Sequence, residues 1–148
     1  MNQLIFKLFK FRSFSLISIA FIAMSAGGQT FKMPCDVSGS LQVGSKSTSF
    51  RHQTVEVEIL TMGRNIFMKI NGDSDYQMQA SSLVTEDYSG VNLTSANQIG
   101  AKRTHRKSGS EYDIRVERES VRLRARAEIL GNDKKTRIEL EGPCTIPK

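Results

Sequence analysis

The sequence predicts an all-β fold, an antiparallel meander of about eight strands that forms a small barrel or a strongly curved sheet. Beyond the N-terminal segment, apolar and polar residues alternate with a period of two, and no stretch repeats apolar residues at helical spacing. Two cysteines, Cys35 and Cys144, stand near the two ends of this alternating region. They predict a disulfide that joins the N- and C-terminal ends of the fold.

The N-terminal segment has the pattern of a signal peptide. A leader with three cations precedes an apolar run from Phe14 to Ala26, which ends among small residues. We therefore expect 1–26 to be a signal peptide and 27–148 a single all-β domain in a periplasmic or secreted environment. The alternative is an uncleaved anchor, but the strongly apolar run is short for a membrane span.

The charge of the chain is modest once this segment is set aside. The formal net charge is +6, but three of the 21 cations lie in the leader, which leaves 18 cations against 15 acids. A net charge of +3 predicts solubility and not the concentrated basic face of a nucleic-acid-binding protein. We expect no nucleic-acid partner and no transmembrane span in the mature chain.

Nine segments alternate well enough to be strand candidates. An even number would let the first and last strands meet when the sheet curls, so we expect the weak run Gly90 to Ser95 to be a loop. A disulfide would then latch the two edges of the sheet. The candidates are Val37 to Val43, Gln53 to Leu60, Asn65 to Ile70, Tyr76 to Ser81, Gly90 to Ser95, Gln98 to Arg106, Glu111 to Arg118, Val121 to Ile129 and Lys135 to Glu141.

The last three strands can be placed in register. A turn centred on Glu119-Ser120 puts every apolar residue of two strands on one face, and a turn at Leu130 to Asp133 does the same for the third. The predicted opposite pairs are Val116 and Leu123, Ile114 and Ala125, Tyr112 and Ala127, then Leu123 and Leu140, Ala125 and Ile138, Ala127 and Thr136. On the other face acids and bases balance, so the run Arg122 to Arg126 reads as a solvated, ion-paired surface.

The positions of the two cysteines in the alternating pattern agree with this predicted sheet. Cys35 shares a face with Val37, and Cys144 shares one with Leu140, so both thiols point toward the core. Closing so long a loop stabilises the fold by about 4–5 kcal/mol in the chain-entropy model.

The search for catalytic or metal-binding residues finds no complete set, so we expect neither an enzyme nor a cofactor. His52 and His105 lack the context of a catalytic triad, and two distant cysteines do not supply a zinc site. Further candidates have simpler explanations as solvated strand faces, a hairpin turn or a chance acceptor motif. These are Glu56 with Glu58, Glu139 with Glu141, Asp73-Ser74-Asp75, and the glycosylation pattern Asn92-Leu93-Thr94.

One local concentration of charge remains, in the segment 102–107. It holds four cations and a histidine without an acid, at a predicted hairpin tip. This cluster could dock an anionic envelope polymer, a lipid headgroup or an acidic protein, and its alternative is a solvated tip. Every alternating register turns a charged or histidine side chain toward the core here. The candidate binding residues are Lys102, Arg103, His105, Arg106 and Lys107.

A small exported β-meander closed by terminal cysteines resembles, in outline, the periplasmic lysozyme inhibitors and the lipocalin-like barrels. The chain has neither the Ser-Gly-Ala loop of those inhibitors nor the Gly-x-Trp motif of lipocalins, so no family is assigned. The leading hypothesis is a non-enzymatic binding module with an anionic partner. The alternative is a carrier that holds a small apolar ligand inside the barrel, although large coreward side chains favour a filled interior.

Overall fold

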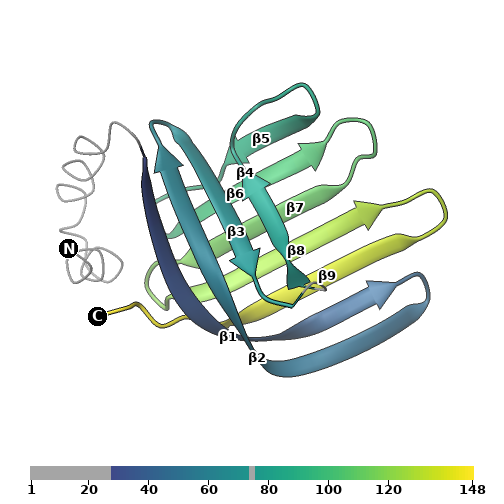
Figure 1. Ribbon diagram of the computed structural model, residues 1–148, viewed down its shortest axis with the longest axis horizontal. Coiled ribbons are helices and arrows are strands. Elements are labelled where there is room, and N and C mark those ends of the chain that lie inside the picture. The colour runs from purple at the N-terminus through teal and green to yellow at the C-terminus, as the bar shows by residue number, and fades with distance from the viewer. Residues whose placement is uncertain (1–27, 74–75) are drawn as a thin grey trace.

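The computed structural model describes residues 28–73 and 76–148, which form one nine-stranded antiparallel sheet wrapped into a nearly closed barrel (Figure 1). The all-β prediction is confirmed. The predicted signal peptide, 1–26, lies outside the described residues. The strands are β1 (Gln29–Val43), β2 (Lys46–Met62), β3 (Asn65–Asn71), β4 (Met78–Ser81), β5 (Tyr88–Asn92), β6 (Gln98–His105), β7 (Glu111–Glu117), β8 (Arg122–Leu130) and β9 (Lys135–Pro143).

The first and last strands, β1 and β9, are neighbours in the middle of the sheet. The strand order is β4-β3-β2-β1-β9-β8-β7-β6-β5, so β1 pairs with both β2 and β9, and the edges are β4 and β5 (Figure 1). Two expectations are therefore wrong. The weak run predicted as a loop contains most of β5, and the disulfide does not latch the sheet edges.

An open seam between β4 and β5 follows from the strand count. Every pair is antiparallel, including β1 with β9, so nine strands force β4 and β5 to run in the same direction. A parallel pair needs a crossover of a dozen or more residues, and only 82–87 connect these strands. The sheet therefore curls until β4 faces β5 and β6 without completing the ladder.

A β-bulge bends β1 and β2, so that each strand changes direction at the bulge. The register between β1 and β2 shifts between Val37 and Gly39, and His52 adopts a φ of 55° on the bulged strand. Before the bulge β1 pairs with β2 alone, and after it the strand pairs with β9 as well. Gly39 is required there, because a Cβ atom would lie 1.8 Å from the carbonyl oxygen of Glu139.

The predicted registers are confirmed for one hairpin and wrong for the other. Val116 lies opposite Leu123 and Ile114 opposite Ala125, as expected. Between β8 and β9 the true register is two residues further along, with Ala125 opposite Leu140. A shift of two preserves which face each side chain occupies, so alternation alone cannot detect it.

The barrel interior is filled by the apolar side of every long strand, confirming the alternation from which the fold was predicted. The largest fully buried side chains come from both halves of the sheet, so one core is shared across it. They are Met33, Val37, Val55, Val57, Met68, Ile70, Ile114, Val116, Leu123 and Leu140.

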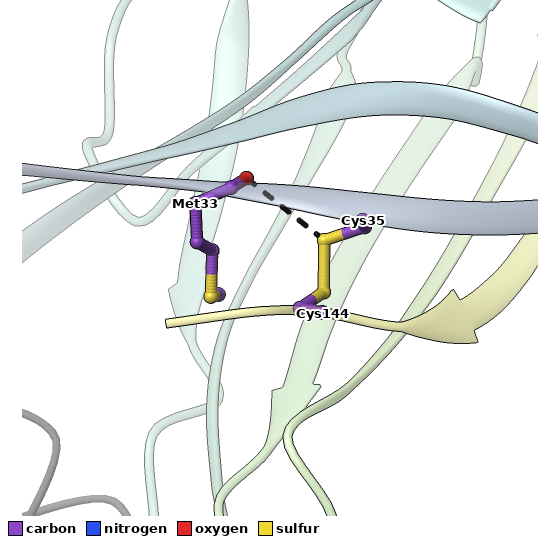
Figure 2. Close-up of a disulfide and its surroundings, with 3 residues drawn as sticks. All are labelled: Met33, Cys35 and Cys144. Carbon is purple, nitrogen blue, oxygen red and sulfur yellow. Dashed lines mark hydrogen bonds between the residues drawn. A yellow bond between two sulfur atoms is a disulfide. The ribbon is translucent and has the colours of Figure 1, made fainter. Parts of the chain in front are cut away.

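The disulfide between Cys35 and Cys144 is confirmed and joins positions 109 residues apart (Figure 2). Cys35 is buried, and its sulfur lies 4.0 Å from the carbonyl oxygen of Met33. This is a packing contact and not a hydrogen bond, because a disulfide sulfur carries no hydrogen. The bond indicates an oxidising, non-cytoplasmic environment. Within 28–73 and 76–148, no helix has the length and apolar character needed to cross a membrane.

Candidate ligand-binding site

The predicted cationic cluster does not form one surface. Alternation along β6 points Lys102 outward, where its Nζ atom lies 3.3 Å from the Glu111 carboxylate. Arg103 faces inward, because it lies opposite Tyr112 of β7, which shares its face with Ala127. The five candidate residues therefore have different environments.

Arg103 is held between two tyrosine rings. Its guanidinium carbon lies 4.4 Å from the ring centre of Tyr88 and 4.8 Å from that of Tyr112. Its Nε atom is buried and has no hydrogen-bond acceptor. In the described part of the chain, no carboxylate lies within 4.0 Å of this guanidinium. Arg103 is thus a half-buried cation that aromatic faces stabilise but no acid neutralises.

Arg137 provides a comparison, because its Nε atom has the same buried state but its charge has acid neighbours. The Nε atom of Arg137 is also buried and without a hydrogen bond. However, the Arg137 guanidinium lies 3.5 Å from Glu128 and 3.8 Å from Glu139, so its charge is compensated. Arg103 has no such neighbour among the residues described, and burying an unpaired polar group costs free energy.

His105 organises the turn that follows β6. Its Nδ1 atom accepts a hydrogen bond from the backbone N–H of Ser108 at 3.1 Å and lies 2.9 Å from the Ser108 hydroxyl. That hydroxyl donates to Ser110, whose own hydroxyl accepts from the Leu130 amide. The contact resembles a serine–histidine pair, but no acid orients the ring among the described residues, and the arrangement stabilises the turn.

The last two residues of the cluster lie at the surface beside the seam. The backbone N–H of Arg106 donates to the carbonyl oxygen of Asp87 at 2.8 Å, and its guanidinium donates to that of Thr85 at 3.3 Å. Arg106 therefore ties linker 82–87 to the β6–β7 turn. Lys107 is exposed, and its ammonium forms no ion pair with a described residue.

A pocket of about 320 Å³ opens at the seam, and Arg103 is part of its wall. β2, β3 and β4 supply most of the lining, and linker 82–87, β5 and β6 complete it. The apolar members are Leu60, Phe67, Met68, Ala80 and Leu83, and the others are Glu58, Lys69, Gln79, Ser81, Thr85, Tyr88 and Arg103. The pocket therefore combines an apolar wall with a cation that lacks an acid partner.

A second depression, shallow and about 700 Å³ in volume, lies over the outer face of β7, β8, β9 and β1. Its charges pair with one another: Glu141 lies 2.9 Å from Arg122, and Arg126 lies 3.8 Å from Glu139. The hydrogen bond from Arg122 lowers the pKa of Glu141. A general acid needs a raised pKa, so the lowered pKa of Glu141 is the opposite of what that role requires.

Of the remaining sequence candidates among the described residues, Glu58 alone lines the seam pocket. His52 is exposed at the bulge, 3.2 Å from Asp36. Lys32 lies 3.8 Å from each of Glu56 and Glu58. Ser74 and Asp75 lie outside the described residues. Among the described residues, no group of three His, Cys, Asp or Glu side chains has metal-site geometry.

Asn92 has a structural role at the end of β5. Its side-chain amide donates to the carbonyl oxygen of Arg64, and its side-chain oxygen accepts from the Thr94 amide. These bonds connect β5 to the β2–β3 turn and form an Asx-turn.

Comparison of the chain with protein-family models, with curated proteins and with solved structures finds no match.

Sequence reasoning identified Arg103 but not the residues that surround it. Tyr88 fell in a segment without a strand prediction, and Tyr112 was assigned to the core. The useful signal was the conflict in 102–107, where any alternating register turns a polar side chain inward.

Proposed function

We propose that the protein is a non-enzymatic, exported binding module that takes an anionic ligand at the corner formed by β5, β6 and linker 82–87. The observation that carries this proposal is the guanidinium of Arg103, which lines a pocket and has no acid partner among the described residues. Export to the periplasm or to the exterior is supported by the signal-peptide pattern in 1–26 and by the disulfide.

The charges around Arg103 support an anion over a neutral ligand. A planar guanidinium presents several N–H donors that match a carboxylate or a phosphate group. The Arg106 guanidinium donates to the carbonyl oxygen of Thr85, which lines the pocket, and exposed Lys107 follows Arg106 in the chain. They would add a positive field that attracts an anion, whereas Lys102 is already paired with Glu111.

Titration with small anions tests the proposal. Acetate and inorganic phosphate, added to the isotope-labelled protein, should shift the NMR signals of Arg103 and its two tyrosine neighbours, and added sodium chloride should weaken the shifts. Arg103→Met should abolish them. Arg51→Met is the matched control, because Arg51 is exposed on β2 and lies outside the pocket. Uniform small shifts that are unchanged in Arg103→Met would contradict the proposal.

A carrier of a small apolar ligand is the second candidate function. It is favoured by the apolar wall of the seam pocket, which includes Leu60, Phe67 and Leu83. Native mass spectrometry of the purified protein tests it, since a bound neutral molecule that survives Arg103→Met would support this candidate over the first.

A further inference from the structure

We infer that the seam pocket binds a short single-chain alkyl carboxylate, with its head group on Arg103 and its chain along the apolar wall. This inference rests on the proposed function and specifies its ligand. It treats the cation and the apolar wall as two halves of one amphiphilic site. Leu60, Phe67 and Leu83 line the same pocket as the Arg103 guanidinium, so one ligand of suitable length can reach all of them.

The head group is assigned from the charge of the lining. The lining holds one acid, Glu58, and two bases, Lys69 and Arg103, so the lining residues by themselves carry one excess positive charge. The Glu58 carboxylate lies 3.8 Å from Lys32 of β1, which is outside the lining. A carboxylate carries one negative charge and matches it, whereas a phosphate monoester at neutral pH carries nearly two and would leave an excess.

The tyrosine rings define how the head group approaches. The guanidinium carbon lies over the ring faces of both Tyr88 and Tyr112, which accept no conventional hydrogen bond, so the N–H groups of the guanidinium remain the donors for a head group. A carboxylate accepts two parallel N–H bonds in the plane of the guanidinium.

The length of the chain is assigned from the volume of the pocket. The pocket has a volume of about 320 Å³. Octanoate is the short alkyl carboxylate chosen as the probe for a site of that volume. The pocket lies at the lower end of the range of ligand sites, which favours a short chain over a long-chain fatty acid.

The position of the pocket at the seam provides access. The linker 82–87 contributes Leu83 and Thr85 to the lining, and single hydrogen bonds to neighbouring strands, not a continuous ladder, hold it in place. Arg106 holds the linker by two hydrogen bonds to carbonyl oxygens of Thr85 and Asp87. A ligand can therefore enter beside this linker without breaking a strand ladder.

The test is titration with three probes that separate head from chain. Octanoate carries both, octanol carries only the chain, and acetate carries only the head group. The protein has three tyrosines and no tryptophan. In Tyr76→Phe the two remaining tyrosines, Tyr88 and Tyr112, therefore provide the tyrosine signals in near-ultraviolet dichroism and fluorescence. Calorimetry on the unsubstituted protein provides the affinities. Octanoate should bind at least about tenfold more tightly than either octanol or acetate.

Variants assign the effect to Arg103. Arg103→Met preserves apolar volume and should reduce octanoate affinity by about tenfold, to that of octanol. Arg103→Lys keeps the charge but not the paired N–H geometry and should retain part of the preference. Arg51→Met should leave octanoate binding unchanged. The probe comparison on the unsubstituted protein needs no variant, so it decides the matter even if Arg103→Met does not fold.

The outcomes distinguish this inference from the proposed function. Acetate and phosphate shifts at Arg103 with no gain from the octyl chain would overturn the inference and leave the anion-binding function standing. Equal affinity for octanoate and octanol would overturn both and favour the neutral carrier. Tighter binding of octyl phosphate than of octanoate would overturn the carboxylate assignment.

Discussion

Cys35 lies directly opposite Cys144 as an antiparallel bridge partner, although 109 residues separate the two in the chain (Figure 2). The disulfide therefore connects two neighbouring strands at the point where β1 and the end of β9 come together. It restricts the unfolded chain in a loop that includes nearly the whole sheet.

Removing the disulfide should lower the stability substantially. We expect Cys35→Ala/Cys144→Ala to reduce the free energy of unfolding by about 2–5 kcal/mol, because a long loop in the unfolded chain is released. Urea titration monitored by far-ultraviolet circular dichroism measures this change. The reduced unsubstituted protein should behave like the variant. A loss below about 1 kcal/mol would show that the β1–β9 ladder, and not the cross-link, holds the ends together.

Gly142 should not accept a side chain. A Cβ atom on this residue would lie 1.9 Å from the carbonyl oxygen of Asp36, and backbone atoms cannot yield without breaking the contact between β1 and β9. We expect Gly142→Ala to cost about 3 kcal/mol or more in thermal or urea unfolding.

The matched control is Gly44→Ala in the β1–β2 turn. A Cβ atom at Gly44 meets nothing within 4 Å, and only the φ of +60° opposes it, so a cost of about 1–2 kcal/mol is expected. Equal effects of Gly142→Ala and Gly44→Ala would argue against the close approach of Asp36 to Gly142.

Gly90 should control the seam. A Cβ atom on Gly90 would lie 2.4 Å from the backbone of Ser82 and 2.5 Å from the carbonyl oxygen of Leu83. We expect Gly90→Ala to push linker 82–87 outward. The amides of Ser82 and Thr85, which donate to the carbonyl oxygens of Ile66 and Tyr88, should then exchange hydrogen faster.

Exchange in the β8–β9 ladder provides the internal reference for this experiment. The exchange rates of the ladder amides should change only as far as the global free energy of unfolding changes. The exchange rates of the Ser82 and Thr85 amides should increase by more than that amount. A uniform increase across both regions would mean that Gly90→Ala destabilises the whole fold and does not act at the seam.

Glu128 should make the outer face sensitive to acid. The hydrogen bond from Lys135, with help from Arg126 and Arg137, lowers the pKa of Glu128 below its usual value. A lowered pKa means that this carboxylate stabilises the fold above the unfolded-state pKa, near 4.5, and that the contribution is lost as the pH falls through the folded-state value.

We therefore expect Glu128→Gln to be less stable than the unsubstituted protein at pH about 7 and to match it at pH about 3. Urea midpoints at the two pH values measure the difference. Glu119→Gln, at an exposed turn position, is the control and should show no such dependence. If Glu128→Gln changed the urea midpoint by the same amount at both pH values, the result would contradict the ion-pair explanation.

The alternation of apolar and polar residues, together with the turn positions, predicted more of the fold than of the candidate site. The turn at Glu119-Ser120 offers a single register that buries both apolar sides, so the β7–β8 pairing followed from the sequence. The β8–β9 register did not, because a shift by two keeps Ala125 and Leu140 on the core face. Asp36 approaching Gly142 is a contact between distant segments that alternation cannot reveal.

The sequence by itself determined the strand faces, the coreward direction of both cysteines, and the presence within 102–107 of a charged or histidine side chain that alternation would turn inward. These are consequences of the two-residue period of a strand and need only neighbours in the chain. The tertiary structure alone decided that β1 pairs with β9, that the seam falls between β4 and β5, and that Arg103 stacks between Tyr88 and Tyr112. Those features depend on the number and direction of all nine strands, because closure of a sheet is a global constraint.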